Sequence, residues 1–434
     1  MASSARFRFA AIAVLALSFS VFLLPSTWRP GCDFTWRHNE VRCLRSGLDP
    51  YDVCFLGAES PEFCSVFHPE PGKKPVNAYS PWQYTWFLPL SHLPLRAAHT
   101  VFMLLNLGAL ALIAVLAGRM GCKCCRGFKS CRGYRSCDDD GKRCNTCNFC
   151  NTCQPLQQST LSLVIASAAC FLGLGLVRVL QVSNYGLLMA AALMLLATVP
   201  NAGPLALCVL MVKPQIGVLF VIPLLFSRRY RTVFGAALLC GLSVLPAAAL
   251  CHGNPVQMVL RVVFSGTHSI RAAEVGTGLL PPPLIAKLSA FAPASVWLAV
   301  SAVAGFGLCL WGSWRLRKHP DFAVRLLPAA TISLLWMQGH FHDRVILALP
   351  LAVFATAALR GNRRAAWMYL LFTAEFWFCL FGGIAALFLS GSPMDILHHP
   401  QARTAYDIFL CIAGIAQVSF VLNTGIQKVS LRGC

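Results

Sequence analysis

Residues 202–226 read AGPLALCVLMVKPQIGVLFVIPLLF, an apolar run of bilayer-spanning length that is interrupted in the middle by Lys213-Pro214. Proline has no N–H to donate and breaks a helix, so each half of the run is too short to span the bilayer. Residues 200–201 (Pro-Asn) precede the run and the basic cluster at 228–231 follows it. Because basic clusters mark cytoplasmic loops, we predict a helical hairpin with both ends at the cytoplasm and Lys213 near its tip.

The composition of the whole chain is that of a membrane protein. Of its 434 residues, 57% are hydrophobic and 12% charged, whereas a soluble domain carries about 25% charged residues. The mean hydropathy is +0.63. The net charge of +20 would suit a nucleic-acid partner, but the Lys and Arg residues lie in short clusters between apolar runs, as topology signals do. We therefore expect an all-α integral membrane protein that binds no nucleic acid.

Apolar runs predict about ten full spans in addition to the hairpin. All basic clusters fall on the cytoplasmic side under this assignment, with both termini in the cytoplasm, as expected for a multi-pass protein of the bacterial cytoplasmic membrane. The predicted regions are a first span at 1–27, an outer loop and interfacial segment at 28–96, a span at 97–118, a cytoplasmic basic cysteine-rich insert at 119–158 and a transmembrane bundle at 159–434. Within that bundle, the predicted spans are 161–180, 185–199, 233–250, 295–314, 324–337, 345–359, 366–389 and 405–422.

Ionisable residues gather on the outer face under this topology. Asp49 lies in the first outer loop, and the sequence His340-Phe341-His342-Asp343 precedes a span. Ionisable groups at membrane depth are costly and are therefore functional candidates. A carboxylate such as that of Asp49 can act as a general base on a hydroxyl, but Asp-Pro is also a common start of a turn.

Lys213 and the two histidines each allow two interpretations. An ammonium in an apolar hairpin needs an anionic partner, which a phosphate or pyrophosphate head group would supply. Alternatively, the Lys213 side chain extends to the interface, where water solvates its charge. His340 and His342 suit general acids, phosphate partners or metal ligands, or they are two solvated interfacial histidines.

Several short motifs follow one another along most of the chain. They are Ser46-Gly47-Leu48-Asp49-Pro50-Tyr51, Ala78-Tyr79-Ser80-Pro81-Trp82 with Leu88-Pro89-Leu90, Gln181 with Ser183 and Asn184, Val212-Lys213-Pro214-Gln215 followed by Arg228-Arg229-Tyr230-Arg231, and His342-Asp343. As an ordered set they resemble family 87 of the GT-C glycosyltransferases, which are polyprenyl-phosphate-mannose-type membrane enzymes. Ser80 stands where the family's Tyr-Pro-Pro stretch has a proline, and Leu180 replaces a glycine before Gln181.

The resemblance implies a GT-C-like helical bundle whose outer loop carries the catalytic acid. It implies inverting transfer of a hexose, with mannose the first choice, from a polyprenyl-phosphate donor to a lipid or glycan acceptor at the outer face. Asp49 would deprotonate the acceptor, while Lys213 and one of His340 or His342 would hold the donor phosphate or the acceptor. The other substrate-binding residues expected from the resemblance are Tyr51, Tyr79, Gln181 and Asp343.

The 21 cysteines include two groups with informative spacing. Cys32, Cys43, Cys54 and Cys64 lie in the first outer loop, where an even number indicates two disulfides with three possible pairings, or else free thiols. In the insert, the Cys-x2-Cys spacing is typical of zinc ligands. The insert also repeats Cys-Arg-Gly and Cys-Asn-Thr, so a low-complexity, thiol-rich basic loop is the alternative. The candidate zinc ligands are Cys144, Cys147, Cys150 and Cys153. No other cofactor is required by the sequence, and it leaves the need for a divalent metal open.

Two further function classes remain open. A transporter of an anionic lipid or solute would also use a broken helix with Lys213 at its tip, although the internal inverted repeats of transporters are not evident. A metal- or redox-sensing membrane protein built around the insert predicts that removal of residues 122–153 abolishes function. A glycosyltransferase should survive that deletion largely active.

Overall fold

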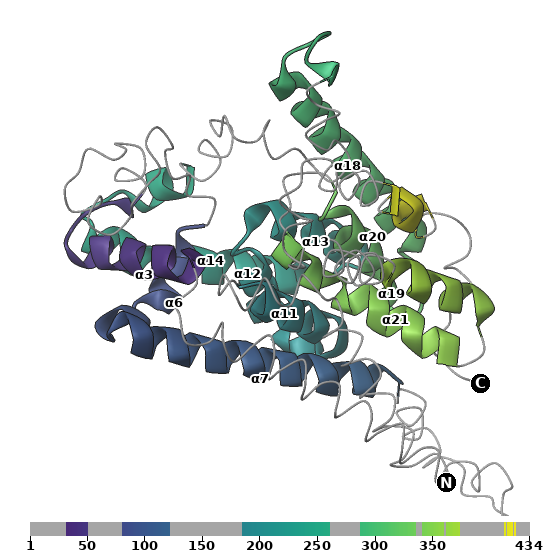
Figure 1. Ribbon diagram of the computed structural model, residues 1–434, viewed down its shortest axis with the longest axis horizontal. Coiled ribbons are helices and arrows are strands. Elements are labelled where there is room, and N and C mark those ends of the chain that lie inside the picture. Colours follow the sequence, from purple (N-terminus) through teal and green to yellow (C-terminus); the bar gives the residue numbers. More distant parts are fainter. Residues whose placement is uncertain are drawn as a thin grey trace, which may run out of the picture.

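The computed structural model describes residues 32–50, 80–121, 185–260, 287–335, 341–359, 362–373, 412–413, 415–419 and 421. Within these ranges all regular structure is helical, which confirms the predicted all-α class (Figure 1). The helices are α3 Cys32–Arg45, α6 Trp82–Phe87, η3 Leu90–His92, α7 Leu95–Gly121, α11 Gly186–Thr198, η5 Pro200–Ala202, α12 Gly203–Leu210, α13 Pro214–Phe226, α14 Tyr230–Leu250, α18 Ala294–Leu316, α19 Phe322–Arg325, α20 Leu327–Ile332, η6 Phe341–Leu347 and α21 Ala348–Leu359.

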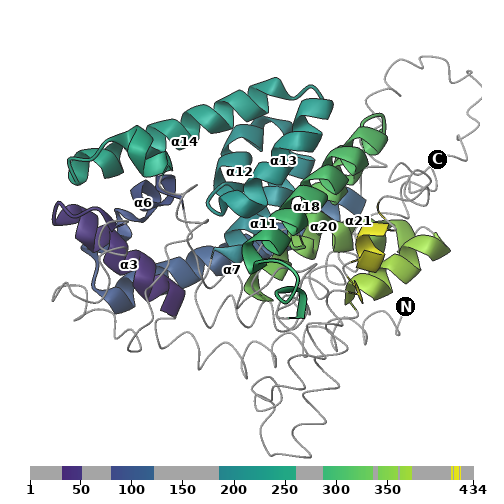
Figure 2. The ribbon, with the colours of Figure 1, turned by 90° about the horizontal axis from the view of Figure 1, so that it is seen from above.

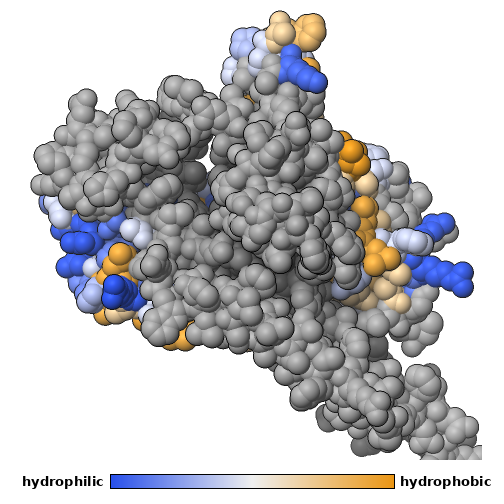
Figure 3. All heavy atoms as spheres, in the orientation of Figure 1, coloured by the Kyte–Doolittle hydropathy of each residue, from blue (hydrophilic) through white to orange (hydrophobic). Residues whose placement is uncertain are grey.

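Three of the described helices are long and apolar enough to cross a bilayer. They contain Leu95–Ala117 of α7, Tyr230–Leu250 of α14 and Ser295–Leu316 of α18, close to the predicted spans. Large apolar side chains remain exposed along α14 at spacings of four, four and three residues, as on a lipid-facing helix; they are Phe234, Leu238, Leu242 and Leu245. Figure 3 shows a band of hydrophobic residues on the right side of the molecule, with hydrophilic ones projecting beyond it, and mainly hydrophilic residues at the left, where Figure 1 places α3. The total number of spans stays a prediction, because other predicted spans fall partly or wholly outside the described residues.

Helix α11 is the centre of the described bundle. All of its 13 residues except Leu188 and Leu195 are buried, as expected for a helix that is apolar on every side. It packs against α7, α12, α21 and η6 (Figures 1 and 2). Two segments that are distant in the sequence, the α12–α13 break and η6, are thereby held near one central helix.

The predicted break at Lys213-Pro214 is confirmed. Helix α12 ends at Leu210, and α13 begins at Pro214. The chain turns back there, because a Cβ added at Gly217 would lie 2.7 Å from the Leu210 carbonyl oxygen; in one continuous helix the two residues would be about 10 Å apart along the axis. Glycine at 217 thus permits the two arms to approach each other closely, and they lie side by side in Figure 2.

The structure differs from the predicted elements in two places. The run 324–337 was expected to form one span, but its described part contains the two short helices α19 and α20. Pro328 lies in the first turn of α20, where a missing N–H does no harm, so it starts a new helix instead of continuing the old one. The polar outer loop at 28–96 also contains a regular helix, α3. The insert boundaries at 119–158 are untested, since residues 122–184 lie outside the described ranges.

Candidate functional site

The broken helix leaves backbone carbonyls that need hydrogen-bond donors, because the last four carbonyls of any helix lack partners inside it. Ser80 supplies donors to Val212 from 132 residues away in the sequence. Its hydroxyl oxygen lies 3.0 Å from the Val212 carbonyl oxygen and 3.2 Å from that of Met211, and its N–H donates to Val212 at 3.3 Å. A proline at position 80 would have neither group. The departure from the family's Tyr-Pro-Pro stretch therefore has a structural use.

Lys213 immediately precedes α13 and forms a buried ion pair. Its Nζ lies 2.5 Å from Oδ1 of Asp343 in η6. The two residues are only 2% and 3% exposed, so water does little to solvate either charge. A buried charge is strongly destabilising unless it is paired. In this structure, the chain itself supplies the anionic partner that an ammonium in an apolar hairpin needs.

Lys213 lies at the N-terminus of α13, an end of a helix that favours negative charge. The first N–H groups of a helix and its dipole attract anions, and α13 is a 13-residue helix whose first residue is Pro214. The Lys213 side chain adds a formal positive charge, and its ammonium is the group that contacts Asp343. An ammonium that pairs with a carboxylate can equally pair with a phosphate oxygen.

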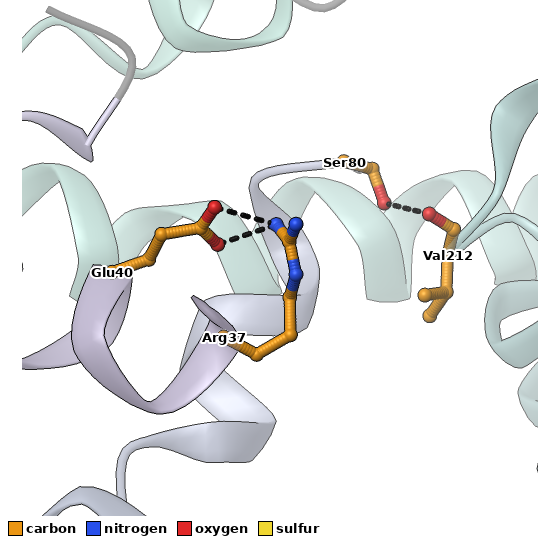
Figure 4. Close-up of polar contacts among 4 residues, drawn as sticks. All are labelled: Arg37, Glu40, Ser80 and Val212. Carbon is orange, nitrogen blue, oxygen red and sulfur yellow. Dashed lines mark hydrogen bonds and ion pairs between the residues drawn. The ribbon is translucent and has the colours of Figure 1, made fainter. Parts of the chain in front are cut away.

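A second buried ion pair lies within α3. Nη1 of Arg37 is 2.7 Å from Oε1 and 2.5 Å from Oε2 of Glu40, and both residues are buried. Figure 4 draws this pair together with the contact between Ser80 and Val212, so that α3, the segment before α6 and the α12–α13 break appear in one view. Helix α3 packs against α6, which closely follows Ser80.

Helix α3 is anchored to the bundle by rings and by hydrogen bonds. Phe34 contacts Phe87 of α6 and Phe102 of α7, with ring centroids 5.6 and 5.2 Å apart, and Phe87 contacts Tyr185 at 5.4 Å. Near its other end, Nη1 of Arg45 donates to the Ser91 carbonyl at 2.8 Å. Tyr185 precedes α11, so the aromatic cluster joins α3 to the central helix.

Asp49 is positioned by the way α3 ends. Gly47 has φ +79, a left-handed conformation that glycine adopts without steric cost. The Leu48 N–H donates to the Cys43 carbonyl and the Gly47 N–H to that of Leu44, both at 3.0 Å. These two bonds form a Schellman cap, which fixes the direction of the chain after the helix. Asp49 therefore follows a helix end of defined geometry, and it is half-buried.

The structure thus brings together some of the predicted site residues. Lys213 and Asp343 are in contact, Ser80 bonds to the residues just before Lys213, and His342 precedes Asp343 within η6. Asp49 belongs to a different part of the fold, the end of α3. The predicted site residues that fall outside the described ranges are Tyr51, Tyr79, Gln181 and His340.

Two of the four cysteines that were predicted to lie in the first outer loop are among the described residues. Cys32 and Cys43 both belong to α3, separated by 11 residues and thus about 16 Å along the axis. A disulfide needs Cα atoms within about 7 Å, so these two cannot pair with each other, and two of the three pairings remain. Cys54, Cys64 and the four candidate zinc ligands, Cys144, Cys147, Cys150 and Cys153, lie outside the described residues. Among the residues that are described, no group of three or more His, Cys, Asp or Glu side chains is arranged to bind a metal.

Sequence reasoning missed three features of the site. It did not find Asp343 as the partner of Lys213, because the contact joins elements 130 residues apart. It did not identify α3, because this helix is rich in polar residues and its buried face includes charged ones such as Arg37. It also overlooked the buried side chain of Gln83. The glycine at position 47 was the one local signal that could have indicated a helix end.

Comparison with known proteins identifies the family. The sequence profile of glycosyltransferase family 87 matches residues 77–337, a region that includes Ser80 and Lys213 but begins after Asp49 and ends before Asp343. Comparisons with curated proteins and with solved structures gave no match. The matched region covers more than half of the chain and agrees with the resemblance seen in the motifs. The chain therefore belongs to glycosyltransferase family 87 and is a glycosyltransferase with membrane-spanning helices.

Proposed function

We propose that this enzyme transfers a hexose, preferentially mannose, from a polyprenyl-phosphate donor to a lipid or glycan acceptor at the outer face of a bacterial cytoplasmic membrane. The observation that carries the proposal is the buried Lys213–Asp343 pair at the N-terminus of α13. A lipid-linked donor presents its phosphate at the membrane interface, and a leaving phosphate needs fixed positive charge. The broken helix offers that charge within an apolar bundle.

The donor phosphate would take over Lys213 from Asp343. Without substrate, the carboxylate neutralises the buried ammonium; with donor bound, a phosphate oxygen would replace it as the anionic partner. The exchange keeps Lys213 paired in both states, and an unpaired buried charge is thus avoided. His340 or His342, adjacent in sequence to Asp343, would supply a further donor to the phosphate or the acceptor. Tyr51, Tyr79 and Gln181 are the remaining proposed substrate contacts.

The proposed chemistry is a single displacement with inversion. The acceptor hydroxyl oxygen attacks the anomeric carbon while the bond from that carbon to the phosphate oxygen breaks. Asp49 takes the hydroxyl proton as general base, and the phosphate leaves with its charge stabilised by Lys213. The Schellman cap at the end of α3 supports this role, because it holds Asp49 in a defined position beside a packed helix.

The test is transfer of radiolabelled sugar from polyprenyl-phosphate mannose to lipid and glycan acceptors in membranes. We expect Asp49→Asn to lower transfer by about 10²- to 10⁴-fold, the usual contribution of a general base. Asp52→Asn, the same change three residues away, is the matched control and should retain transfer. Persistent transfer by a normally inserted Asp49→Asn protein would remove Asp49 from this role. Absence of transfer from any polyprenyl-phosphate sugar by well-folded native protein would favour the transporter hypothesis.

A further inference from the structure

The side chain of Gln83 is buried without hydrogen bonds. It lies in the first turn of α6 and is 0% exposed. Neither its Oε1 nor its Nε2 has a hydrogen-bond partner within the described part of the chain, and the indole N–H of the preceding residue, Trp82, is also buried without an acceptor there. Buried polar groups in folded proteins are almost always paired. An amide that is unsatisfied at both ends among the described residues is therefore a candidate to pair with a bound ligand.

Gln83 is close to the outer-face site. Its backbone N–H donates to the Ser80 carbonyl at 3.3 Å, and Ser80 in turn bonds to Val212, the neighbour of Lys213. One helical turn later, on the same face of α6, Phe87 contacts Tyr185 at the start of α11. Helix α11 packs against η6, which carries Asp343. The segment that carries Gln83 thus contacts the hairpin tip through Ser80 and the residue that caps α11 through Phe87.

The chemistry of an amide restricts what it can bind. Its Nε2 offers two donors, and its Oε1 accepts. A phosphate oxygen only accepts, so a phosphate would pair with Nε2 and leave Oε1 unsatisfied. A pair of neighbouring sugar hydroxyls both donates and accepts, and therefore satisfies the two ends of the amide at once.

We propose that Gln83 binds hydroxyl groups of the donor's hexose ring and so contributes to sugar specificity. This inference rests on the proposed function, since the phosphate of the same donor would lie at Lys213. A site built to pair with hydroxyls discriminates strongly against ligands that lack them, because its buried polar groups would then remain unpaired. Gln83 is thus a specificity-determining residue, distinct from the proposed base and from the phosphate-binding lysine.

The experiment compares two glutamine substitutions of the same kind in the full-length protein. Gln83→Met keeps the shape of the side chain but removes the amide. Gln417→Met is the matched control, because Gln417 is also buried but already donates to the Leu371 carbonyl at 3.5 Å. The ligands are polyprenyl-phosphate mannose, polyprenyl-phosphate glucose and polyprenyl phosphate without sugar. The readouts are the melting temperature with and without each ligand, and kcat/KM for transfer.

We expect Gln83→Met to raise the melting temperature of the ligand-free protein or leave it unchanged, since an unsatisfied amide is removed. The extra stabilisation that a sugar-bearing lipid gives over polyprenyl phosphate should disappear, and kcat/KM should fall about 10- to 100-fold. Stabilisation by polyprenyl phosphate itself should remain. Gln417→Met should retain both the sugar-dependent stabilisation and transfer.

Two results would overturn the inference. One is a Gln83→Met protein that keeps the full difference between sugar-bearing and sugar-free lipid. The other is a lower melting temperature without ligand and unchanged kcat/KM, which would mean that the amide pairs with water or with the chain itself. If native protein binds the sugar-bearing lipids through Gln83 but transfers no sugar, Gln83 is supported and the proposed reaction fails. If sugar-bearing lipid stabilises native protein no more than polyprenyl phosphate does, the inference on Gln83 fails, whether or not the protein transfers sugar.

Discussion

The two buried ion pairs differ in how far apart along the chain their partners lie. Arg37 and Glu40 are three residues apart in one helix, whereas Lys213 and Asp343 belong to the broken helix and to η6, 130 residues apart. Both pairs are almost fully buried. The first can form as soon as α3 forms. The second exists only when the hairpin tip and η6 have come together against α11.

This difference separates a structural pair from a pair suited to exchange. Arg37–Glu40 places two long side chains along one helix surface, and nothing in its position at mid-helix favours another anion. Lys213 lies at the N-terminus of α13, and its partner comes from a separate element, η6. We propose that an incoming phosphate can therefore replace Asp343 as the partner of Lys213. The long-range pair is the one that we connect with catalysis.

The largest expected effect is on the Lys213–Asp343 pair. Lys213→Met and Asp343→Leu should each lower the free energy of unfolding by about 3–5 kcal/mol, because each removes one member of a buried ion pair and leaves the other charge buried. The double variant should recover most of this stability, since neither charge remains. It should still lack transfer, because the cation that we propose to bind the donor phosphate is absent. Thermal unfolding in detergent and sugar transfer in membranes measure the two properties.

Additive losses of stability in the double variant would contradict the contrast between the two pairs. If the double variant loses the sum of the two single effects, the pair does not act as a unit. If the double variant retains transfer, Lys213 has no part in binding the donor phosphate.

The next effect concerns Arg37–Glu40 and is confined to stability. Arg37→Met should lower the free energy of unfolding by about 3–5 kcal/mol, because it leaves the buried Glu40 carboxylate without its cation. Transfer per folded molecule should be unchanged, because the pair stabilises α3 without contacting the proposed donor. Unfolding temperatures and transfer normalised to folded protein check this. Loss of transfer in fully folded Arg37→Met protein would contradict the structural role and would make Arg37 a second candidate for phosphate binding.

The smallest expected effect concerns the pH dependence of stability that comes from His38 in α3. Burial lowers the pKa of His38 below its ordinary value of 6.5, partly offset by the contact of its Nε2 with the Leu93 carbonyl. The unfolded chain then takes up a proton at higher pH than the folded chain. Stability is therefore full above pH 6.5 and is lost as the pH falls below 6.5 toward the folded pKa. Melting temperatures at about pH 7.5 and about pH 5.5 should differ more for native protein than for His38→Gln. An equal change in melting temperature for native protein and His38→Gln would show that His38 does not contribute to the pH dependence of stability.

Some of this site could be predicted from the sequence, and the reason is local chemistry. A lysine followed by proline within an apolar run predicts a helix break, and the structure has that break. The ordered motifs indicated the family that the profile match confirms. The identity of the partner of Lys213 was not predictable, because local patterns hold no information about which distant segment packs against the hairpin tip.

The predicted helix boundaries were wrong where helix propensity and hydropathy disagree with tertiary packing. The run 324–337 is apolar enough for a span, yet it divides into α19 and α20 near Pro328. Helix α3 is polar enough for a loop, yet Phe34 and its aromatic neighbours hold it against the bundle. In both cases the deciding contacts come from other elements.

The most direct test of the central claim is the affinity for polyprenyl phosphate of native protein, Asp343→Asn and Lys213→Met. If phosphate replaces Asp343 as the partner of Lys213, Asp343→Asn should bind the lipid about tenfold more tightly, because its competing carboxylate is gone. Lys213→Met should bind it at least about tenfold more weakly. Equal affinities in all three folded proteins would show that the buried pair is not the donor-phosphate site.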